Sequence, residues 1–232
     1  MRRCLGWLMG CGLIWFSGVA AMPKPPKTVL VLGDSLSAAH NIPLASGWVH
    51  LLDLRLRKMV PPWRAINASI SGETSLSGRN RLPALLKTWQ PAVVVIELGA
   101  NDGLQGLSLP VLRDNLAAMI AMARKARARV LLLGIELPVN YGPRYRDGLR
   151  AVYADLAREK HVALVPFLLE GVALDPALMQ RDGLHPVAAA EPKVLDTVWQ
   201  PLQPLLRGRR ASTRTPSEPS APLSHHPHPA AG

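Results

Sequence analysis

Five short runs of apolar and β-branched residues lie along the chain, each followed by glycine, proline or a polar residue. Within a run the apolar residues are nearly continuous, whereas a strand with one exposed face would alternate apolar and polar residues. A continuous pattern is typical of a parallel sheet covered by helices on both faces. We therefore expect strands at residues 28–33, 64–68, 92–98, 129–135 and 162–165.

Amphipathic segments separate these runs and predict helices at residues 47–59, 109–127, 148–160 and 188–206. Ser108 is the expected N-cap of the second helix, and Pro192 and Pro201 are expected to interrupt the last one. The inward positions of the first two helices recur at three- and four-residue intervals: Val49, Leu52, Leu56 and Met59, then Leu112, Leu116, Ile120 and Ala123. Repeated alternation of strand and helix predicts an α/β fold, a parallel sheet with right-handed crossovers.

The N-terminal segment has the pattern of a secretory signal peptide. A basic start, Met1-Arg2-Arg3, precedes an apolar stretch that ends in small residues before Met22, so residues 1–21 are expected to be removed on export. An uncleaved membrane anchor and a lipid attached at Cys11 are the alternatives. Cys4 and Cys11 both lie in this segment, and the exported chain would therefore contain neither a disulfide nor a cysteine nucleophile. The expected location is periplasmic or secreted.

The C-terminal residues 207–232 are basic and rich in proline and histidine, a composition that predicts disorder. Residues 22–206 then form one domain, which is expected to be a monomer. Of the net charge of +11, about six units belong to this domain. They indicate either a weak association with anionic membrane surfaces or a bias of composition without a partner. No stretch interleaves basic and aromatic residues, which argues against nucleic-acid binding. The tail histidines, His225, His226 and His228, are not expected to form a functional metal site.

Candidate chemistry begins at the end of the first expected strand. Gly33 allows a turn, and Ser35 follows at the carboxyl edge of the sheet, where parallel α/β proteins bind their ligands. A serine hydroxyl becomes a good nucleophile when a base removes its proton and a carboxylate orients that base. Asp182 and His185, three residues apart on a loop, can supply both groups. His40, His50 and His161 are interpreted as ordinary surface or core residues.

Two further strand ends carry groups that could stabilise a tetrahedral oxyanion. Gly72 follows the second expected strand and offers a backbone N–H group, and Asn101 follows the third and offers a side-chain amide. Either residue alone would be an ordinary turn residue. A receiver-like signalling domain shares the alternating pattern, but Asp34 lacks the acidic neighbour that such a domain needs.

In this order, Gly33-Asp34-Ser35-Leu36, Gly72, Gly99-x-Asn101-Asp102 and Asp182-x-x-His185 resemble the four sequence blocks of the SGNH (GDSL-type) hydrolases. The wider blocks are similar to those of the arylesterase, thioesterase and lysophospholipase subgroup. The resemblance implies a three-layer, flavodoxin-like fold with strand order 2-1-3-4-5. It also implies Ser35 as nucleophile, His185 as base and Asp182 as its orienting group. The oxyanion hole would comprise Ser35, Gly72 and Asn101, with no metal or organic cofactor.

The sequence therefore predicts an exported serine esterase that hydrolyses aryl or acyl esters, acyl-CoA thioesters or lysophospholipids. A carbohydrate O-deacetylase and a non-catalytic binding module on the same scaffold are the alternatives. Loop residues expected to line an apolar substrate groove are Leu104, Leu107, Leu137, Pro138, Val139 and Tyr141. Three places depart from the subgroup pattern: Ala39-His40 replaces a glycine and an aromatic residue, Ala100 replaces a common glycine, and Glu191-Pro192 after the His185 loop is close to but not the same as the usual ending.

Overall fold

The structure, a computed structural model, describes residues 26–207. The expected signal peptide at residues 1–21, Cys4, Cys11 and the tail beyond Arg207 lie outside the described residues. Between residues 26 and 207, no helix combines the length and the apolar character needed to cross a bilayer.

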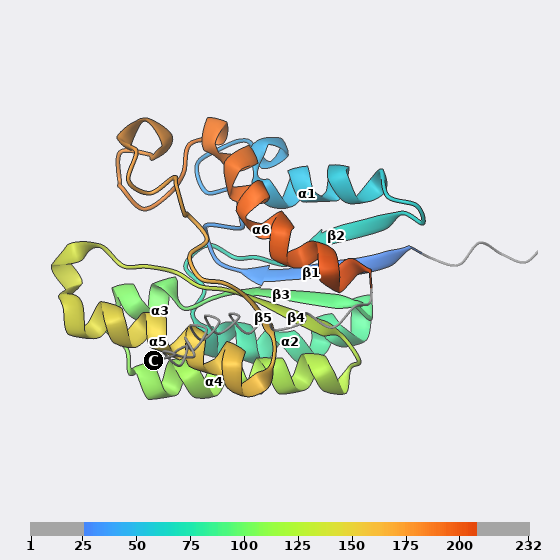
Figure 1. The fold of residues 1–232 in the computed structure, drawn as a ribbon, viewed down its shortest axis with the longest axis horizontal. Helices are drawn as coiled ribbons and strands as arrows, with labels where there is room; N and C mark the ends of the chain where they lie inside the picture. The colour runs from blue at the N-terminus through green and yellow to red at the C-terminus, as the bar shows by residue number, and fades with distance from the viewer. Residues whose placement is uncertain (1–25, 208–232) are drawn as a thin grey trace, which may run out of the picture.

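A five-stranded parallel sheet forms the centre of the fold (Figure 1). Its strands are β1 (Lys27–Gly33), β2 (Trp63–Asn67), β3 (Val93–Glu97), β4 (Arg129–Leu133) and β5 (Ala163–Val165). They lie in the order β2-β1-β3-β4-β5. Each strand lies where a continuous apolar run predicted it, and both the fold class and the strand order are confirmed.

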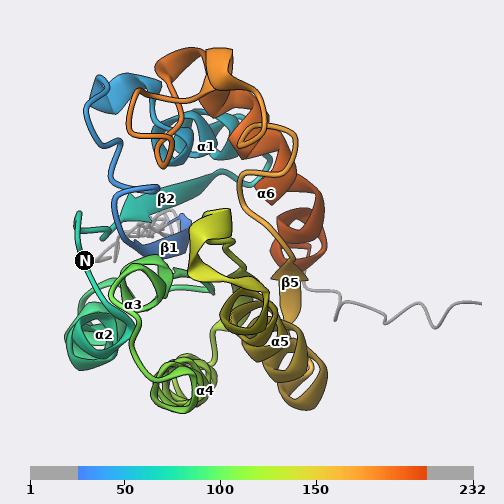
Figure 2. The ribbon, with the colours of Figure 1, turned by 90° about the vertical axis from the view of Figure 1, so that its left-hand side faces the viewer.

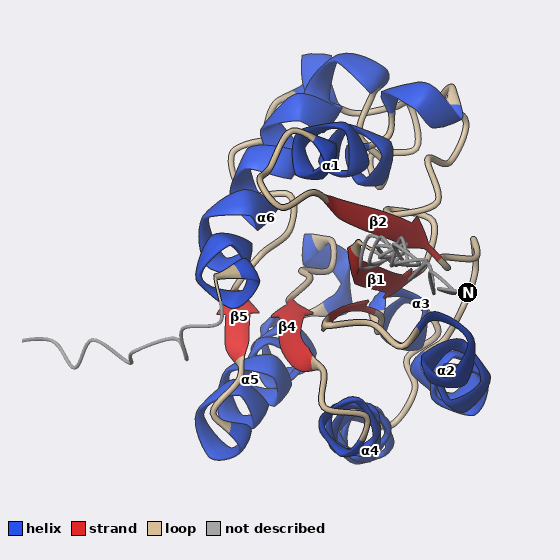
Figure 3. Ribbon diagram, turned by 90° about the vertical axis from the view of Figure 1, so that its right-hand side faces the viewer, coloured by secondary structure: helices blue, strands red, loops and turns tan. Residues whose placement is uncertain are grey.

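Helices cover both faces of the sheet. On one face lie α1 (Trp48–Arg57) and α6 (Glu191–Leu206), and on the other α2 (Ser75–Trp89), α4 (Leu109–Lys125) and α5 (Pro143–Lys160). A short helix, α3 (Ala100–Leu104), follows β3 at the carboxyl edge of the sheet. Figures 2 and 3 show these two helical layers from opposite sides. The connecting 3-10 turns are Leu44–Ser46, Val139–Tyr141, Pro176–Leu178 and Ala188–Ala190.

Two cores result from the alternation of side chains along each strand. Val29 and Val31 of β1 pack under α1 and α6, whereas Leu30 and Leu32 pack against the α2, α4 and α5 layer. All four side chains are completely buried. Because both faces of the sheet are covered, both sets of alternate positions must be apolar, which explains the continuous runs.

The helices differ from expectation in several places. Ser108 is the N-cap residue of α4, as expected, but its side chain makes no capping hydrogen bond. Pro192 lies in the first turn of α6, where proline fits, and the helix continues through Pro201. The buried apolar face of α6, which includes Val198 and Leu202, offsets the backbone hydrogen bond lost at Pro201. The sequence pattern predicted neither α2 nor α3, and α5 begins at Pro143 instead of residue 148.

Candidate active site

The candidate residues meet at the carboxyl edge of the sheet. Ser35 follows β1, Gly72 follows β2, and Asn101 lies in α3 directly after β3. Asp182 and His185 lie on the loop between β5 and α6. Parallel strands end at the same edge, so residues that are far apart in the sequence converge there.

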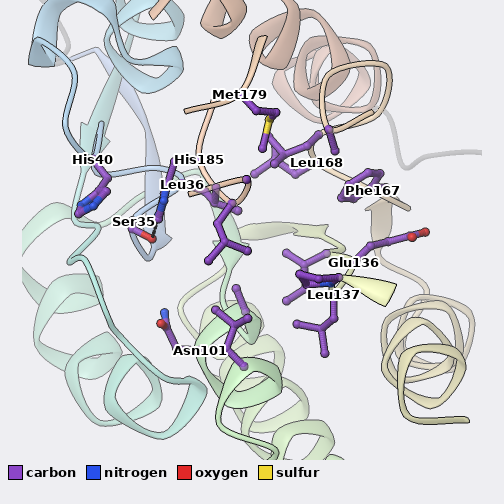
Figure 4. Close-up of a pocket in the computed structure, with 18 of the residues that line it drawn as sticks. Ser35, Leu36, His40, Asn101, Glu136, Leu137, Phe167, Leu168, Met179 and His185 are labelled. Carbon is purple, nitrogen blue, oxygen red and sulfur yellow. Dashed lines mark hydrogen bonds between the residues drawn. The ribbon is translucent and has the colours of Figure 1, made fainter. Parts of the chain in front are cut away.

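A hydrogen-bonded relay connects three of these side chains. Ser35 Oγ lies 2.7 Å from His185 Nε2, and His185 Nδ1 lies 2.8 Å from Asp182 Oδ2. Figure 4 shows the Ser35–His185 contact at the edge of a pocket. With a proton on Nδ1, the imidazole donates to the carboxylate and can accept the serine proton at Nε2. This geometry allows Ser35 to act as an activated nucleophile.

Asp182 is held by its own loop. Its Oδ1 atom accepts hydrogen bonds from the N–H groups of Leu184 at 2.9 Å and His185 at 3.1 Å. Partial burial opposes ionisation, but the hydrogen bonds from Leu184 and from the backbone and ring of His185 outweigh it and lower the pKa of Asp182 to about 2. The group is therefore a carboxylate at neutral pH and can stabilise a protonated His185.

Further contacts fasten this loop to the rest of the site. The N–H of Gln180 donates to the carbonyl of His185 at 2.7 Å, and an antiparallel bridge joins Met179 to Pro186. The side-chain amide of Gln180 donates to the carbonyls of His40 and Pro186, both at 2.9 Å. Gln180 thus connects the loop that carries His185 to the segment that follows Ser35.

Backbone and amide donors surround the position opposite His185. Among residues 26–207, the N–H groups of Ser35 and Gly72 donate to no protein acceptor, so both are available to an oxyanion. Gly72 has φ +81°, a conformation that favours glycine. Asn101 Nδ2 donates to the carbonyl of Glu73 at 3.0 Å and to Asp34 Oδ2 at 3.2 Å. An oxyanion would have to share one of these hydrogens.

His40 is part of the site, contrary to its interpretation as an ordinary residue. Its ring lies 4.4 Å from the ring of His185, with 37° between the planes. The contact was missed because His40 has no acidic partner nearby in the sequence, although it follows Ser35 by only five residues. His40, Asp182 and His185 each offer a ligand atom, all within 4.8 Å of one another. A metal ion held there would occupy the base of the relay and interrupt it.

An apolar pocket of about 470 Å³ opens beside the relay. Leu104, Leu137, Pro138 and Val139 line it, as the sequence predicted. Leu107 and Tyr141 are not among its lining residues, and the hydroxyl of Tyr141 instead donates to the carbonyl of Leu104 at 3.0 Å. The remaining apolar lining comes largely from the segment after β5, which sequence analysis did not single out: Phe167, Leu168, Leu169, Ala173, Leu174 and Met179. Figure 4 shows several of these side chains around the pocket.

A serine–histidine contact beside an apolar pocket is what an ester hydrolase of this fold needs. Comparison with known proteins shows that the chain belongs to this class. Residues 31–191 match the GDSL-like lipase/acylhydrolase family. The chain belongs to this family and is an enzyme that acts on ester bonds.

Characterised relatives span most of the chain. Esterase TesA of Pseudomonas aeruginosa is 53% identical over 207 residues, which cover 89% of this chain and 100% of the relative. The thioesterase 1/protease 1/lysophospholipase L1 of Escherichia coli is 44% identical over 84% of this chain and 89% of the relative. A crystal structure of TesA superposes with a TM-score of 0.75 at 52% identity, covering 77% of this chain and 99% of that one. The esterase EstA of Pseudoalteromonas, inhibited by monoethylphosphonate, gives a TM-score of 0.74 at 38% identity, covering 78% of this chain and 99% of that one.

Proposed function

We propose that the protein is an exported serine esterase that hydrolyses acyl esters and thioesters through Ser35, His185 and Asp182. The observation that carries this proposal is the relay of 2.7 Å and 2.8 Å contacts that ends at Ser35, on the edge of the apolar pocket. The pocket offers space for an acyl chain, and the relay supplies the nucleophile.

The reaction would take place in two halves. Ser35 Oγ attacks the carbonyl carbon while His185 Nε2 takes the hydroxyl proton, and the carbonyl oxygen becomes an oxyanion between Ser35, Gly72 and Asn101. Collapse of this intermediate breaks the bond to the leaving group, which receives the proton from His185. Water then attacks the acyl-serine with His185 again as base. The acid is released and the Ser35 hydroxyl is restored.

The character of the pocket supports acyl substrates over carbohydrate esters. Its walls are predominantly aliphatic, and they continue from Leu36 and Leu137 to Leu168 and Met179. A sugar would bring its hydroxyl groups against these aliphatic walls, where few lining side chains, among them Asn101, Glu136 and Arg146, can form hydrogen bonds. Aryl esters, acyl-CoA and lysophospholipids each combine an apolar part with a scissile carbonyl, in keeping with the names of the relatives.

Export is the part of the proposal that rests on the sequence. The basic start and the apolar stretch of residues 1–21 support a cleaved signal peptide and a periplasmic or secreted enzyme. Expression of the full chain followed by N-terminal sequencing of the exported product tests this point. Cleavage before Met22 is expected, and retention of the intact N-terminus on a membrane fraction would contradict it.

The catalytic proposal is tested by comparing the wild type with Ser35→Ala. Substrates are p-nitrophenyl esters of increasing chain length, palmitoyl-CoA and lysophosphatidylcholine. We expect Ser35→Ala to lower kcat by about 10⁴-fold or more on every substrate that the wild type cleaves. A fluorophosphonate probe should label the wild type at Ser35 and leave the variant unlabelled. Full activity or full labelling of Ser35→Ala would disprove the mechanism.

A further inference from the structure

Glu97, the last residue of β3, lies directly beneath the turn that carries Ser35. It pairs in register with Gly33 at the end of β1, and its side chain is completely buried. Its Oε2 atom accepts hydrogen bonds from the N–H of Asp34 at 3.1 Å and from Ser37 Oγ at 2.8 Å. One carboxyl oxygen therefore holds the residue before Ser35 and the second residue after it.

The turn is shaped around this carboxyl group. A Cβ atom on Gly33 would lie 2.6 Å from Glu97 Oε2 and 2.8 Å from Ser37 Oγ, which is closer than carbon can approach. Only glycine at position 33 therefore leaves room for Glu97 under the turn. The other oxygen, Glu97 Oε1, is buried and accepts no hydrogen bond from the described residues. Burying a carboxyl group in a core costs free energy of folding, which suggests that Glu97 has a role other than packing.

Glu97 also acts on Asp34, a second buried carboxyl. Burial, together with the charge of Asp34, raises the pKa of Glu97 well above its usual range. Burial raises the pKa of Asp34 to about 6, while the hydrogen bond from the N–H of Leu36 and the electrostatic effect of His185 restrain that rise.

Asp34 in turn contacts the oxyanion donor. Its Oδ1 atom accepts from the N–H of Leu36 at 3.1 Å, and its Oδ2 atom accepts from Asn101 Nδ2 at 3.2 Å. A chain of polar contacts therefore runs from Glu97 through Asp34 to Asn101, and Ser35 lies on the turn that Glu97 fixes.

We propose that Glu97 is a positioning residue of the reaction, whose buried carboxyl fixes the Ser35 turn and, through Asp34, aims the amide of Asn101. This inference rests on the proposed roles of Ser35 and Asn101. Glu97 touches neither the substrate nor the reacting atoms. Its effect is to hold a nucleophile and an oxyanion donor in a fixed relation before the substrate arrives.

The test compares Glu97→Gln with Glu97→Leu. Glutamine keeps the acceptor, because its carbonyl can accept from the N–H of Asp34 and from Ser37 Oγ at the position of Glu97 Oε2. We expect Glu97→Gln to keep kcat within about 10-fold of the wild type. Leucine fills a similar volume without hydrogen bonds, and we expect it to lower kcat by about 10²-fold, the scale of one lost oxyanion donor, with KM changed less than threefold.

A matched control separates positioning from stability. Glu191 is also a buried carboxyl that accepts from a backbone N–H, that of Trp48 at 2.7 Å, but it does not contact the Ser35 turn. Glu191→Leu should lower the urea midpoint as Glu97→Leu does while leaving kcat within about threefold. Equal losses of kcat in the two leucine variants would overturn the proposal.

A double-mutant cycle with Asn101→Ala tests the route of the effect. If Glu97 acts through Asn101, the double variant with Glu97→Leu should be little slower than the worse single variant. The inference would be overturned if the losses of kcat in the two single variants multiplied in the double variant. It would also be overturned if Glu97→Leu kept the wild-type kcat, or if Glu97→Gln were as slow as Glu97→Leu. Failure of the proposed function would be evident separately, because Ser35→Ala would then retain activity with Glu97 intact.

Discussion

Two aspartates on either side of Ser35 and His185 have opposite environments. Asp34 is completely buried at the end of β1, and burial raises its pKa to about 6. Asp182 lies on a surface loop with 38% of its side chain exposed. There, hydrogen bonds from Leu184 and His185 prevail over a smaller desolvation and lower its pKa to about 2. Asp34 thus ionises less readily than an ordinary aspartate, whereas Asp182 ionises more readily.

The contrast follows from how each half of the site is built. The nucleophile and the oxyanion donors directly follow strands of the sheet, and beneath the Ser35 turn the carboxyl groups of Asp34 and Glu97 are completely buried. The base and its aspartate lie on a loop that supplies its own donors, since the N–H groups of Leu184 and His185 both point at Asp182. A group that only fixes geometry can be buried in neutral form, whereas a group that stabilises an imidazolium must stay charged.

Of the two aspartate substitutions, Asp182→Asn should lower kcat the most. Asparagine can still accept from the two backbone N–H groups, but an amide facing Nδ1 would favour the tautomer that carries its proton on Nε2. That tautomer cannot accept the Ser35 proton. We expect kcat to fall by about 10³- to 10⁴-fold at pH 7 to 8. Steady-state hydrolysis of a p-nitrophenyl ester measures it.

Asp34→Asn is the matched variant on the buried side, and it should lose less activity than Asp182→Asn because His185 keeps its tautomer. If Asp34→Asn were the slower of the two, or if Asp182→Asn stayed within 10-fold of the wild type, the assigned roles would be reversed or absent.

The pH dependence of stability should distinguish the two aspartates by sign. The folded-state pKa of Asp34, about 6, exceeds the usual 3.8, so the folded protein binds more protons than the unfolded chain between these values. Asp34 therefore destabilises the fold as the pH rises through this window. The folded-state pKa of Asp182, about 2, is below 3.8, so its contribution is present above that value and is lost as the pH falls toward 2.

Urea unfolding followed by tryptophan fluorescence gives the free energy of unfolding at each pH. The difference between wild type and each variant then measures the contribution of Asp34 or Asp182. The stability advantage of wild type over Asp34→Asn should shrink from pH 4 to pH 6. Its advantage over Asp182→Asn should shrink from pH 4 toward pH 2. Two difference curves with the same slope would contradict the opposite shifts.

The sequence pointed to the relay of Ser35, His185 and Asp182 but not to the buried carboxyl of Glu97 beneath the Ser35 turn. Asp182 and His185 are three residues apart, so one loop reveals their relation, and Ser35 could be placed because its strand has a continuous apolar run. Glu97 could not be recognised, because in the sequence it is one polar residue at the end of an apolar strand. Its role depends on pairing with Gly33, a contact between residues 64 positions apart, which only the sheet register brings together. His40 was missed for a similar reason, since ring contacts across loops leave no periodic pattern.

Alanine substitutions at two glycines, Gly33 beneath the Ser35 turn and Gly183 on the Asp182 loop, should have the smallest effects and test the same comparison through stability. At Gly33, on the buried side, an added Cβ would meet Glu97 Oε2 at 2.6 Å, and Gly33→Ala should lower the free energy of unfolding by about 1–3 kcal/mol. At Gly183, on the exposed loop, no atom lies within 4 Å of an added Cβ and only the φ of +66° opposes alanine. Gly183→Ala should therefore cost about 1 kcal/mol. Combining Gly33→Ala with Glu97→Ala should recover part of the first loss, because the nearest crowding atom is removed while those of Ser37 remain. A Gly183→Ala variant less stable than Gly33→Ala, or a double variant without recovery, would show that Glu97 does not crowd the turn.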